Sequence, residues 1–255
     1  MAAALISCIC NKKIAKSIIA SDKNEKNLEN IKKQFKIKTT ADNKEAVKGS
    51  EIVFICVKPQ DIDEVLEEIK DAVKNRLIVS IAAGIKLKHI ENILKNKRII
   101  RVMPNINCLV GEMAAGFSAG QYATKEDVED VSKILNSAGK SFFIEEDLLD
   151  AVTGISGSAP AFFAYFIKAF EEAGMKNGLQ KEMALKLAAQ TALGTGKLLL
   201  EKNLSPDELI RMVASKKGTT EAGLKILKKN KVDNILVKTI NAAVERSKEL
   251  GNERS

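Results

Sequence analysis

The stretch EIVFICV, at residues 51–57, decides how this chain folds. After Glu51 every residue is apolar and β-branched side chains dominate, which is typical of a central strand buried on both faces of a parallel sheet. Lys58 and Pro59 follow directly, and because proline cannot continue a hydrogen-bonded ladder, we predict that the strand ends there. Lys58 would then lie at the carboxyl edge, where open α/β sheets bind ligands. The alternative is a solvent-exposed lysine beside a turn.

On both sides of this strand, short β-branched runs alternate with amphipathic stretches. Strands that alternate with helices at this spacing predict crossover units and a mainly parallel sheet. The predicted strands are residues 17–20, 37–39, 51–57, 77–81, 99–103 and 141–144. The predicted helices between them are residues 25–34, 42–47, 61–73, 86–94 and 125–137.

After about Glu146 the β pattern stops, and the remaining sequence is predicted to be helical. The expected helices are residues 159–173, 181–201, 206–213, 220–229 and 232–250. Several, such as residues 162–170 and 184–193, are apolar around much of their circumference and must bury against something. A helical domain with a homodimer interface meets that need. We therefore predict an α/β domain over residues 1–146 and an all-α domain over residues 147–255.

The composition excludes several classes of protein. No run approaches the roughly 20 apolar residues that cross a bilayer, and the apolar start is followed, not preceded, by lysines, so we expect a cytoplasmic protein without a signal peptide. The net charge of +8 comes from lysines interspersed with acids, with few aromatic residues, which argues against nucleic acid as a partner. His89 is the only histidine, and the four cysteines predict neither a disulfide framework nor a metal site.

Several strings, in order along the chain, are similar to the pyrroline-5-carboxylate reductase family. They are residues 57–60 (VKPQ), 80–85 (SIAAGI), 101–105 (RVMPN), 150–158 (DAVTGISGS), 188–191 (AAQT), 215–220 (SKKGTT) and 245–251 (ERSKELG). The resemblance covers essentially the whole chain. It implies a Rossmann-type dinucleotide-binding domain followed by an all-α dimerisation domain. It also implies reduction of 1-pyrroline-5-carboxylate to proline by NADP(H), with NAD(H) as the alternative, in a homodimer or a ring of dimers.

The expected cofactor site lies where three predicted strands end. Small residues after the second of these strands would let a flat ring or a ribose approach the backbone, although simple turn chemistry is the alternative. At the end of the strand at residues 17–20, an acid would favour NAD and a cation NADP. Both are present, and the resemblance favours NADP. The resemblance assigns cofactor binding to Met1, Asp22, Lys23, Asn43, Cys56, Val57, Lys58, Ala82, Ala83 and Gly84.

The expected substrate site centres on the SKKGTT loop, which precedes a helix. Free backbone N–H groups and the helix dipole favour an anion there, although an ordinary threonine cap is the alternative. In the family this loop binds the substrate carboxylate, a threonine matching Thr220 faces the ring nitrogen, and a serine matching Ser158 lines the pocket. For Ser158, a helix cap ahead of Pro160 is the alternative. The resemblance thus assigns catalysis to Thr220 and Ser158. It assigns substrate binding to Ser158, Ser215, Gly218, Thr219, Thr220 and Asn105.

One departure from the family is large. Family members begin with a strand and a Gly-x-Gly-Asn-Met loop, and Met1 falls on the methionine of that loop. The absent strand would pair with the strands at residues 17–20 and 51–57, so we expect two unpaired edges and the loss of the amides that cradle the pyrophosphate. We therefore expect Met1 to be an internal methionine, or the chain to be truncated.

Two alternative functions stay open. The first is a catalytically inactive homologue that serves only as a dimeric helical module. The second is a reductase of another imine or of a β-hydroxy acid. The SKKGTT loop argues against that second alternative, and Lys168 lies too far along from Ser158 to serve as the catalytic lysine of a β-hydroxyacid dehydrogenase.

Overall fold

The structure, a computed structural model, describes residues 1–252 and divides into two compact units. An α/β unit contains Met1–Ser158 and, of the described residues, 242–252, and a helical unit contains Ala159–Asn241. The sequence placed its domain boundary earlier, after residue 146, where the strands end. In the structure, the short helical segments that follow the last strand belong to the same compact unit as the sheet. The boundary of that unit is therefore at Ser158 and not at residue 146.

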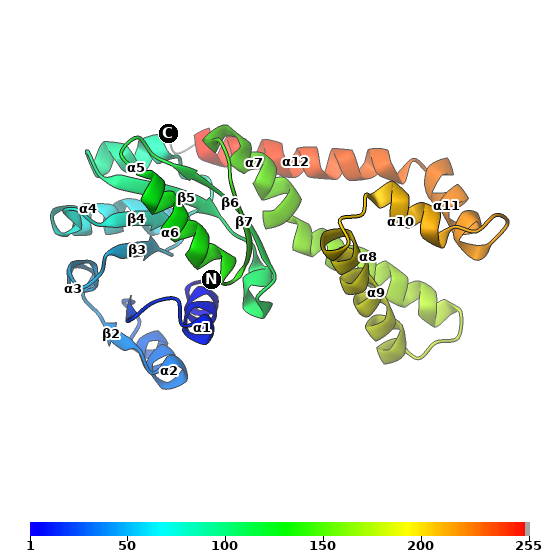
Figure 1. The fold of residues 1–255 in the computed structure, drawn as a ribbon, viewed down its shortest axis with the longest axis horizontal. Helices are drawn as coiled ribbons and strands as arrows, with labels where there is room; N and C mark the ends of the chain where they lie inside the picture. The colour runs from blue at the N-terminus through cyan, green and yellow to red at the C-terminus, as the bar shows by residue number, and fades with distance from the viewer. Residues whose placement is uncertain (253–255) are drawn as a thin grey trace. The chain divides into compact units, whose positions relative to one another are not determined.

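The α/β unit alternates strands and helices, as the sequence predicted (Figure 1). Its strands are β1 (Ile19–Ser21), β2 (Lys38–Thr40), β3 (Ile52–Ile55), β4 (Leu77–Ser80), β5 (Arg98–Met103), β6 (Met113–Ala119) and β7 (Gly139–Phe143). Its α-helices are α1 (Ala2–Lys12), α2 (Glu25–Phe35), α3 (Asn43–Lys48), α4 (Ile62–Val73), α5 (Leu87–Ile93), α6 (Lys125–Asn136) and α7 (Leu149–Val152). Three 3₁₀ turns (Pro59–Asp61, Ile106–Val110 and Glu146–Leu148) and one π-helical turn (Thr153–Gly157) complete it.

Five strands form the main sheet in the order β3-β4-β5-β6-β7. The pairs β3–β4, β4–β5 and β6–β7 are parallel, and only β5–β6 is antiparallel. The prediction omitted β6, because its sequence MAAGFSA is rich in small residues that have low β propensity. It forms a strand because both edges are paired and because Met113, Ala115 and Phe117 are buried.

Strands β1 and β2 form a separate parallel pair, with Ile19 opposite Lys38 and Ser21 opposite Thr40. Within residues 1–252, no ladder of hydrogen bonds joins β1 to β3. The sequence predicted unpaired edges on these two strands, and the topology confirms that prediction.

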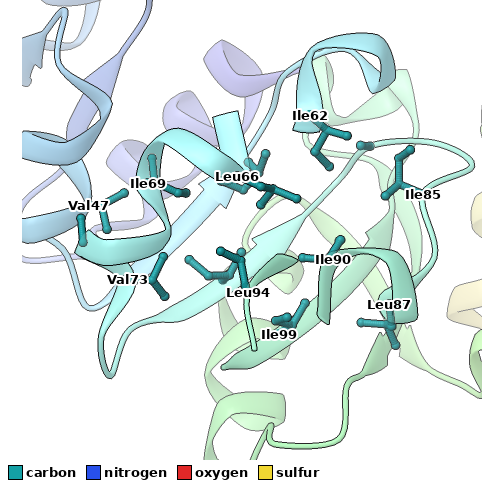
Figure 2. Close-up of a cluster of buried hydrophobic side chains, with 14 residues drawn as sticks. Val47, Ile62, Leu66, Ile69, Val73, Ile85, Leu87, Ile90, Leu94 and Ile99 are labelled. Atoms are coloured by element: carbon teal, nitrogen blue, oxygen red, sulfur yellow. The ribbon is translucent and has the colours of Figure 1, made fainter. Parts of the chain in front are cut away.

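Helices cover both faces of the main sheet. On one face, α4 and α5 pack a core that includes Leu66, Ile69 and Ile90, all fully buried (Figure 2). On the other face, α1 contributes Ala4 and Leu5 to a core that also contains residues of α6 and of strands β4–β6. The sheet is thus covered on both faces, as predicted. The prediction that residues 51–57 form a central strand is wrong: β3 is an edge strand of the main sheet, it ends at Ile55, and of its four residues only Ile55 is buried.

The helical unit contains α8 (Ala159–Lys176), α9 (Lys181–Glu201), α10 (Pro206–Val213), α11 (Thr219–Lys229) and the first part of α12 (Val232–Asn252). Ser205 caps α10 in a capping box with Glu208. Gly174 lets α8 approach α9, because a Cβ there would come within 2.9 Å of the Ala184 Cβ. Over the described part of the chain, none of the helices combines the length and apolar character that crossing a membrane requires.

Candidate active site

Three neighbouring parallel strands bring most of the expected cofactor residues to one edge of the sheet. Strands β3, β4 and β5 lie side by side and run in the same direction. The segments that follow them, at residues 56–58, 81–84 and 104–105, therefore lie at the same carboxyl edge. The sequence predicted this convergence, and it is where open α/β sheets bind ligands.

The turn after β4 gives each of its three small residues a different environment. Ala82 is buried, Ala83 is exposed and Gly84 is buried. Gly84 has φ +75°, and a Cβ there would contact the backbone of Leu250 and Gly251 at the end of α12. The backbone conformation and this packing explain the glycine, so Ala83 is the residue of the three that presents an open surface.

The segment after β3 combines a half-buried thiol with an exposed cation. Burial raises the pKa of the Cys56 thiol to about 12, and the amino group of Met1 opposes that shift. Ala4 and Leu5 belong to the apolar cluster against which Phe54 of β3 packs, so the start of α1 lies near β3. Lys58 is exposed and has no carboxylate partner within residues 1–252. A helix start and a free lysine at one edge favour the binding of an anion.

A second polar group forms where β1 ends. The Ser21 hydroxyl donates to Asn43 Oδ1 (2.8 Å), and Asn43 Nδ2 donates to Glu68 Oε2 (2.8 Å). Both oxygens of Asp22 accept hydrogen bonds, from the Asn24 N–H (2.8 Å) and from the Asn27 side chain (3.0 Å). Asp22 and Asn43 therefore shape this turn.

Lys23 lies beside Asp22 and has a different environment. Its side chain is exposed, and it makes no ion pair with any carboxylate of the described chain. Of the two charged residues at the end of β1, Lys23 is therefore the one whose charge remains available to a ligand.

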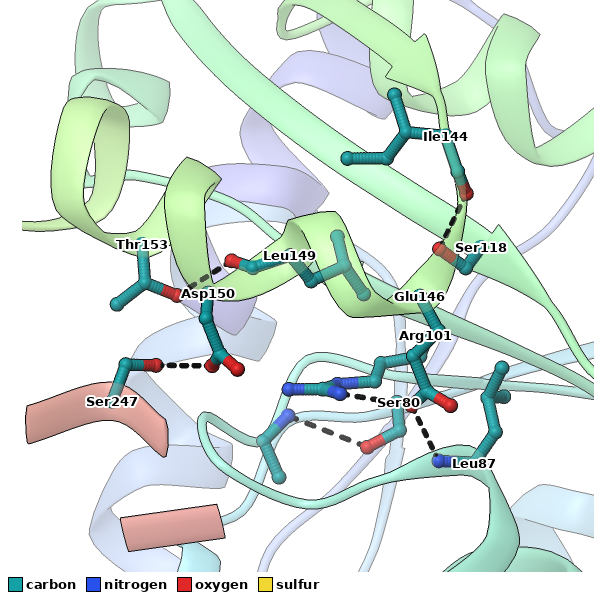
Figure 3. A network of polar contacts seen from close by, with 11 residues as sticks. Ser80, Leu87, Arg101, Ser118, Ile144, Glu146, Leu149, Asp150, Thr153 and Ser247 are labelled. Atoms are coloured by element: carbon teal, nitrogen blue, oxygen red, sulfur yellow. Dashed lines mark hydrogen bonds and ion pairs between the residues drawn. The ribbon is translucent and has the colours of Figure 1, made fainter. Parts of the chain in front are cut away.

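A polar network that the sequence analysis missed holds the elements around this edge together (Figure 3). Buried Arg101 of β5 pairs with Glu146 at 2.8 Å, and Glu146 also accepts the N–H of Leu87 at 2.7 Å. Ser247 of α12 donates to Asp150 at 2.6 Å. The network ties β5, the start of α5, α7 and the end of α12 to one another. Arg101, a charge between apolar residues in the interior of β5, is the sequence signal that could have revealed it.

Two expected substrate residues of the α/β unit have contrasting surroundings. Asn105 is buried, and its side-chain amide bonds to Ala114 and Ser156 of the protein. Ser158 is half-buried, and its hydroxyl has no hydrogen-bond partner in the part of the chain that the structure describes. Its backbone angles (φ −87°, ψ −29°) are helical, which excludes the helix cap considered as an alternative.

The remaining expected substrate residues share one loop of the helical unit. Lys217 has left-handed φ (60°) and donates its N–H to the carboxylate of Glu221. Gly218 precedes α11, and a Cβ there would collide with the Ser215 hydroxyl. Thr219 and Thr220 begin the helix, slightly earlier than predicted, and their N–H groups lie in its unpaired first turn. The hydrogen bond from the Lys217 N–H to Glu221 was not predicted, although an acid in the first turn of a helix is a recognisable sequence signal.

Family models match both parts of the chain. One described as "Pyrroline-5-carboxylate reductase dimerisation" matches residues 146–250, and one described as "NADP oxidoreductase coenzyme F420-dependent" matches residues 1–84. A pyrroline-5-carboxylate reductase from Methanosarcina acetivorans is 39% identical over 237 residues, which cover 92% of this chain and 88% of the relative. This chain belongs to the pyrroline-5-carboxylate reductase family.

Solved structures of the family have the same fold. A pyrroline-5-carboxylate reductase from Coxiella burnetii is 31% identical with a TM-score of 0.94, over 98% of this chain and 94% of that one. A Plasmodium falciparum pyrroline carboxylate reductase with NADP bound is 30% identical with a TM-score of 0.85, over 97% and 93% of the two chains. The predicted Rossmann-type domain followed by a helical dimerisation domain is confirmed.

Within this member of the pyrroline-5-carboxylate reductase family, the expected site residues other than Met1 and Ser158 fall into three groups. The strand-end group contains Cys56, Val57, Lys58, Ala82, Ala83, Gly84 and Asn105. A second group, around the end of β1, contains Asp22, Lys23 and Asn43. The loop group of the helical unit contains Ser215, Gly218, Thr219 and Thr220. Among residues 1–252, no cluster of three histidine, cysteine or acidic side chains could hold a metal ion. The individual roles of these residues stay predictions.

Proposed function

We propose that this chain reduces 1-pyrroline-5-carboxylate to L-proline with a hydride from NADPH, the last step of proline biosynthesis. The observation that carries the proposal is the similarity to pyrroline-5-carboxylate reductases along nearly the whole chain, which spans both units. We further propose that it works in the cytoplasm, as a homodimer or a ring of dimers.

The chemistry asks little of the protein beyond positioning. The substrate carries a C=N bond, and its protonated iminium form accepts a hydride at carbon. The enzyme must orient this ring and donate or accept hydrogen bonds at its polar groups. The free hydroxyl of Ser158, and Thr220 in the first turn of α11, suit that task. The backbone N–H groups of Thr219 and Thr220 would bind the carboxylate, with Ser215 and Gly218 shaping the loop.

The α/β unit has the features that a dinucleotide needs. NADPH, when bound, supplies the hydride. The start of α1 at Met1 and the exposed ammonium of Lys58 would face its phosphates, and the open surface of Ala83 would admit a flat ring. Cys56, Val57, Ala82 and Gly84 would form the floor of that surface through packing.

The turn after β1 supports NADP over NAD as the preferred cofactor. Asp22 already accepts two hydrogen bonds from the turn, whereas the charge of Lys23 is available to a ligand. Asn43 would contact the same end of the cofactor. A cation at this position favours the additional phosphate of NADP, since a carboxylate is needed to bind the free ribose hydroxyl of NAD.

The test measures loss of NADPH absorbance on addition of 1-pyrroline-5-carboxylate. The variant Thr220→Val removes a hydroxyl at the substrate loop, and we expect kcat/KM to fall at least about tenfold. The matched control is Thr239→Val, which removes a hydroxyl that bonds only to Ile235 of its own helix (2.9 Å), and it should leave kcat/KM unchanged. Lys23→Gln should raise KM for NADPH while leaving KM for NADH unaltered.

The separation of β1 from β3 supports one other function, that of an inactive dimerisation module. An unaltered chain that forms dimers yet neither binds NADPH nor consumes it would favour that function. Consumption of NADPH with 1-pyrroline-5-carboxylate would exclude it.

A further inference from the structure

We infer that Asn105 is a positioning residue, which acts through Ser156 and the π-helical turn Thr153–Gly157 to orient the hydroxyl of Ser158. This inference rests on the proposed function, because it assumes that Ser158 contacts the substrate. It differs from the expectation for Asn105, which the family resemblance assigned to substrate binding. The reason for the change is that the side-chain amide of Asn105 is already engaged by the protein.

Three residues from three elements form a closed ring of hydrogen bonds, here called the Asn105 clamp. The Ala114 N–H of β6 donates to Asn105 Oδ1 at 3.2 Å, and Asn105 Nδ2 donates to Ser156 Oγ at 3.1 Å. Ser156 Oγ in turn donates to the carbonyl oxygen of Ala114 at 2.7 Å. Asn105 Nδ2 also reaches the carbonyl oxygen of Ser156, at 3.4 Å.

The direction of every bond in the ring is determined by chemistry. The Ala114 N–H can only donate, so the oxygen of the Asn105 amide must face it and the amide nitrogen must face Ser156. The Ser156 hydroxyl then accepts from Asn105 and donates to a carbonyl that can only accept. Asn105 and Ser156 are 5% and 9% exposed, so water cannot readily replace a lost partner. Aspartate at position 105 would put an oxygen where the ring needs a donor.

The clamp holds an unusual piece of backbone. The Ser158 N–H donates to the carbonyl of Thr153 at 2.8 Å, five residues earlier, so the turn contains one more residue than an α-helical turn. Successive residues of an α-helix are rotated by roughly 100°, so the additional residue changes the direction of Ser158 by about that angle. The turn also lies close to β5, because a Cβ on Gly157 would collide with the end of the Met103 side chain.

These contacts connect the strand ends to Ser158. Asn105 lies two residues after the end of β5, and Ser156 lies two residues before Ser158. If the clamp opened, the turn could relax toward regular helix, and the Ser158 hydroxyl would rotate away from the direction that it has here. The clamp thus sets the orientation of a side chain that it does not touch.

The test uses Ser156→Ala, which deletes one hydroxyl, together with Asn105→Ala and Ser158→Ala. We expect Ser156→Ala to raise KM for 1-pyrroline-5-carboxylate about tenfold while KM for NADPH stays within about twofold. Because Ser156 acts through Ser158, the double variant Ser156→Ala/Ser158→Ala should be no worse than Ser158→Ala alone. The matched control is Ser118→Ala, which removes another buried hydroxyl, bonded to Ile144 at 2.6 Å, and should leave both KM values unchanged.

Other outcomes would overturn the inference. Three outcomes would each refute the positioning role and leave the proposed function intact. Ser156→Ala could leave the substrate KM unchanged, or Ser118→Ala could raise it equally. In the third outcome, the rise in substrate KM of the double variant equals the product of the rises in the two single variants. An unaltered chain without activity would refute the proposed function and the positioning role together. Hydrogen exchange at the Ser158 amide supplies a readout that needs no activity: protection that does not fall in Ser156→Ala or Asn105→Ala would refute the clamp itself.

Discussion

The two units of this chain differ in how far their large apolar side chains are buried. In the α/β unit, residues such as Leu66 and Ile78 are fully buried between sheet and helices. In the helical unit, large apolar side chains such as Tyr165 and Leu200 remain 72% and 76% exposed, and α10 and α11 bury none of their residues. The α/β unit is therefore stabilised by its own core, whereas the helical unit leaves large apolar side chains exposed. This unit lies within the part of the chain that matches the family model for dimerisation.

The strongest test of this contrast compares two leucines. Leu66→Ala should lower the free energy of unfolding by about 2–5 kcal/mol, because it leaves a cavity in a filled core. Leu200→Ala should change it by less than about 0.5 kcal/mol in a single chain, since that side chain is already exposed. Urea denaturation at low protein concentration measures both. Equal losses for the two variants would contradict the contrast.

The next largest effect concerns association, and the two tyrosines of the chain form a matched pair. Tyr165→Asp should weaken the dimer about 100-fold, because it puts a charge on the apolar surface of the helical unit. Tyr122→Asp, on the α/β unit where the tyrosine is 43% exposed, should leave the dimer intact. Sedimentation velocity over a dilution series gives the dissociation constants. A dimer weakened only by Tyr122→Asp would place the interface on the other unit.

A smaller effect is expected in the polar network of the α/β unit. Arg101→Met should destabilise the fold by about 2 kcal/mol, because it leaves the Glu146 carboxylate without its cation, although part of that carboxylate reaches water. The matched control is Lys133→Met, which breaks an exposed pair with Asp130 and should cost less than about 0.5 kcal/mol. Thermal unfolding of the two variants compares them. Similar losses of stability in the two variants would mean that burial does not strengthen the Arg101–Glu146 pair.

The smallest effect is a pH dependence of stability that comes from Cys56, directly after β3. Burial raises the pKa of Cys56 from 9.0 to about 12, so the thiol stays protonated in the folded chain while the unfolded thiol ionises. The contribution of this thiol is intact below pH 9 and is lost as the pH rises from 9 toward 12, by up to about 1 kcal/mol per pH unit. The free energy of unfolding, measured in urea at pH 8, 9 and 10, should therefore fall less steeply with pH for Cys56→Ala than for the unaltered chain. Parallel slopes would show that the thiol is not buried as described.

The sequence pattern predicted those helices and strands whose formation depends mainly on residues that are neighbours in the chain. A strand within the apolar run at residues 51–57, the capped helix after Ser205 and the alternation of strands with helices were all predicted from neighbouring residues. The place of that strand at the edge of the main sheet was not predicted. Strand β6 was not, because its small side chains carry little strand preference and its backbone is held by partners on both edges. The Arg101–Glu146 pair was also missed, since its two residues lie far apart in the sequence.

The candidate site shows the same division. The residues of the strand ends and of the loop at positions 215–220 were named from the sequence, because their motifs resemble one family over nearly the whole chain. Which of them remain open to a ligand could not be read from those motifs. The side chains of Asn105 and Asp22 form hydrogen bonds within the protein. The side chains of Ser158, Lys23 and Lys58 have no such partner in the described part of the chain.

The sequence by itself determined the fold class, the family and the positions of the motifs, because those depend on periodicity and on short strings. Only the tertiary structure decided the strand order, the buried ion pair, the π-helical turn and the separation of polar groups into engaged and free ones. The physical reason is that hydrogen bonds and burial depend on residues brought together from distant parts of the chain, and no local pattern encodes their partners.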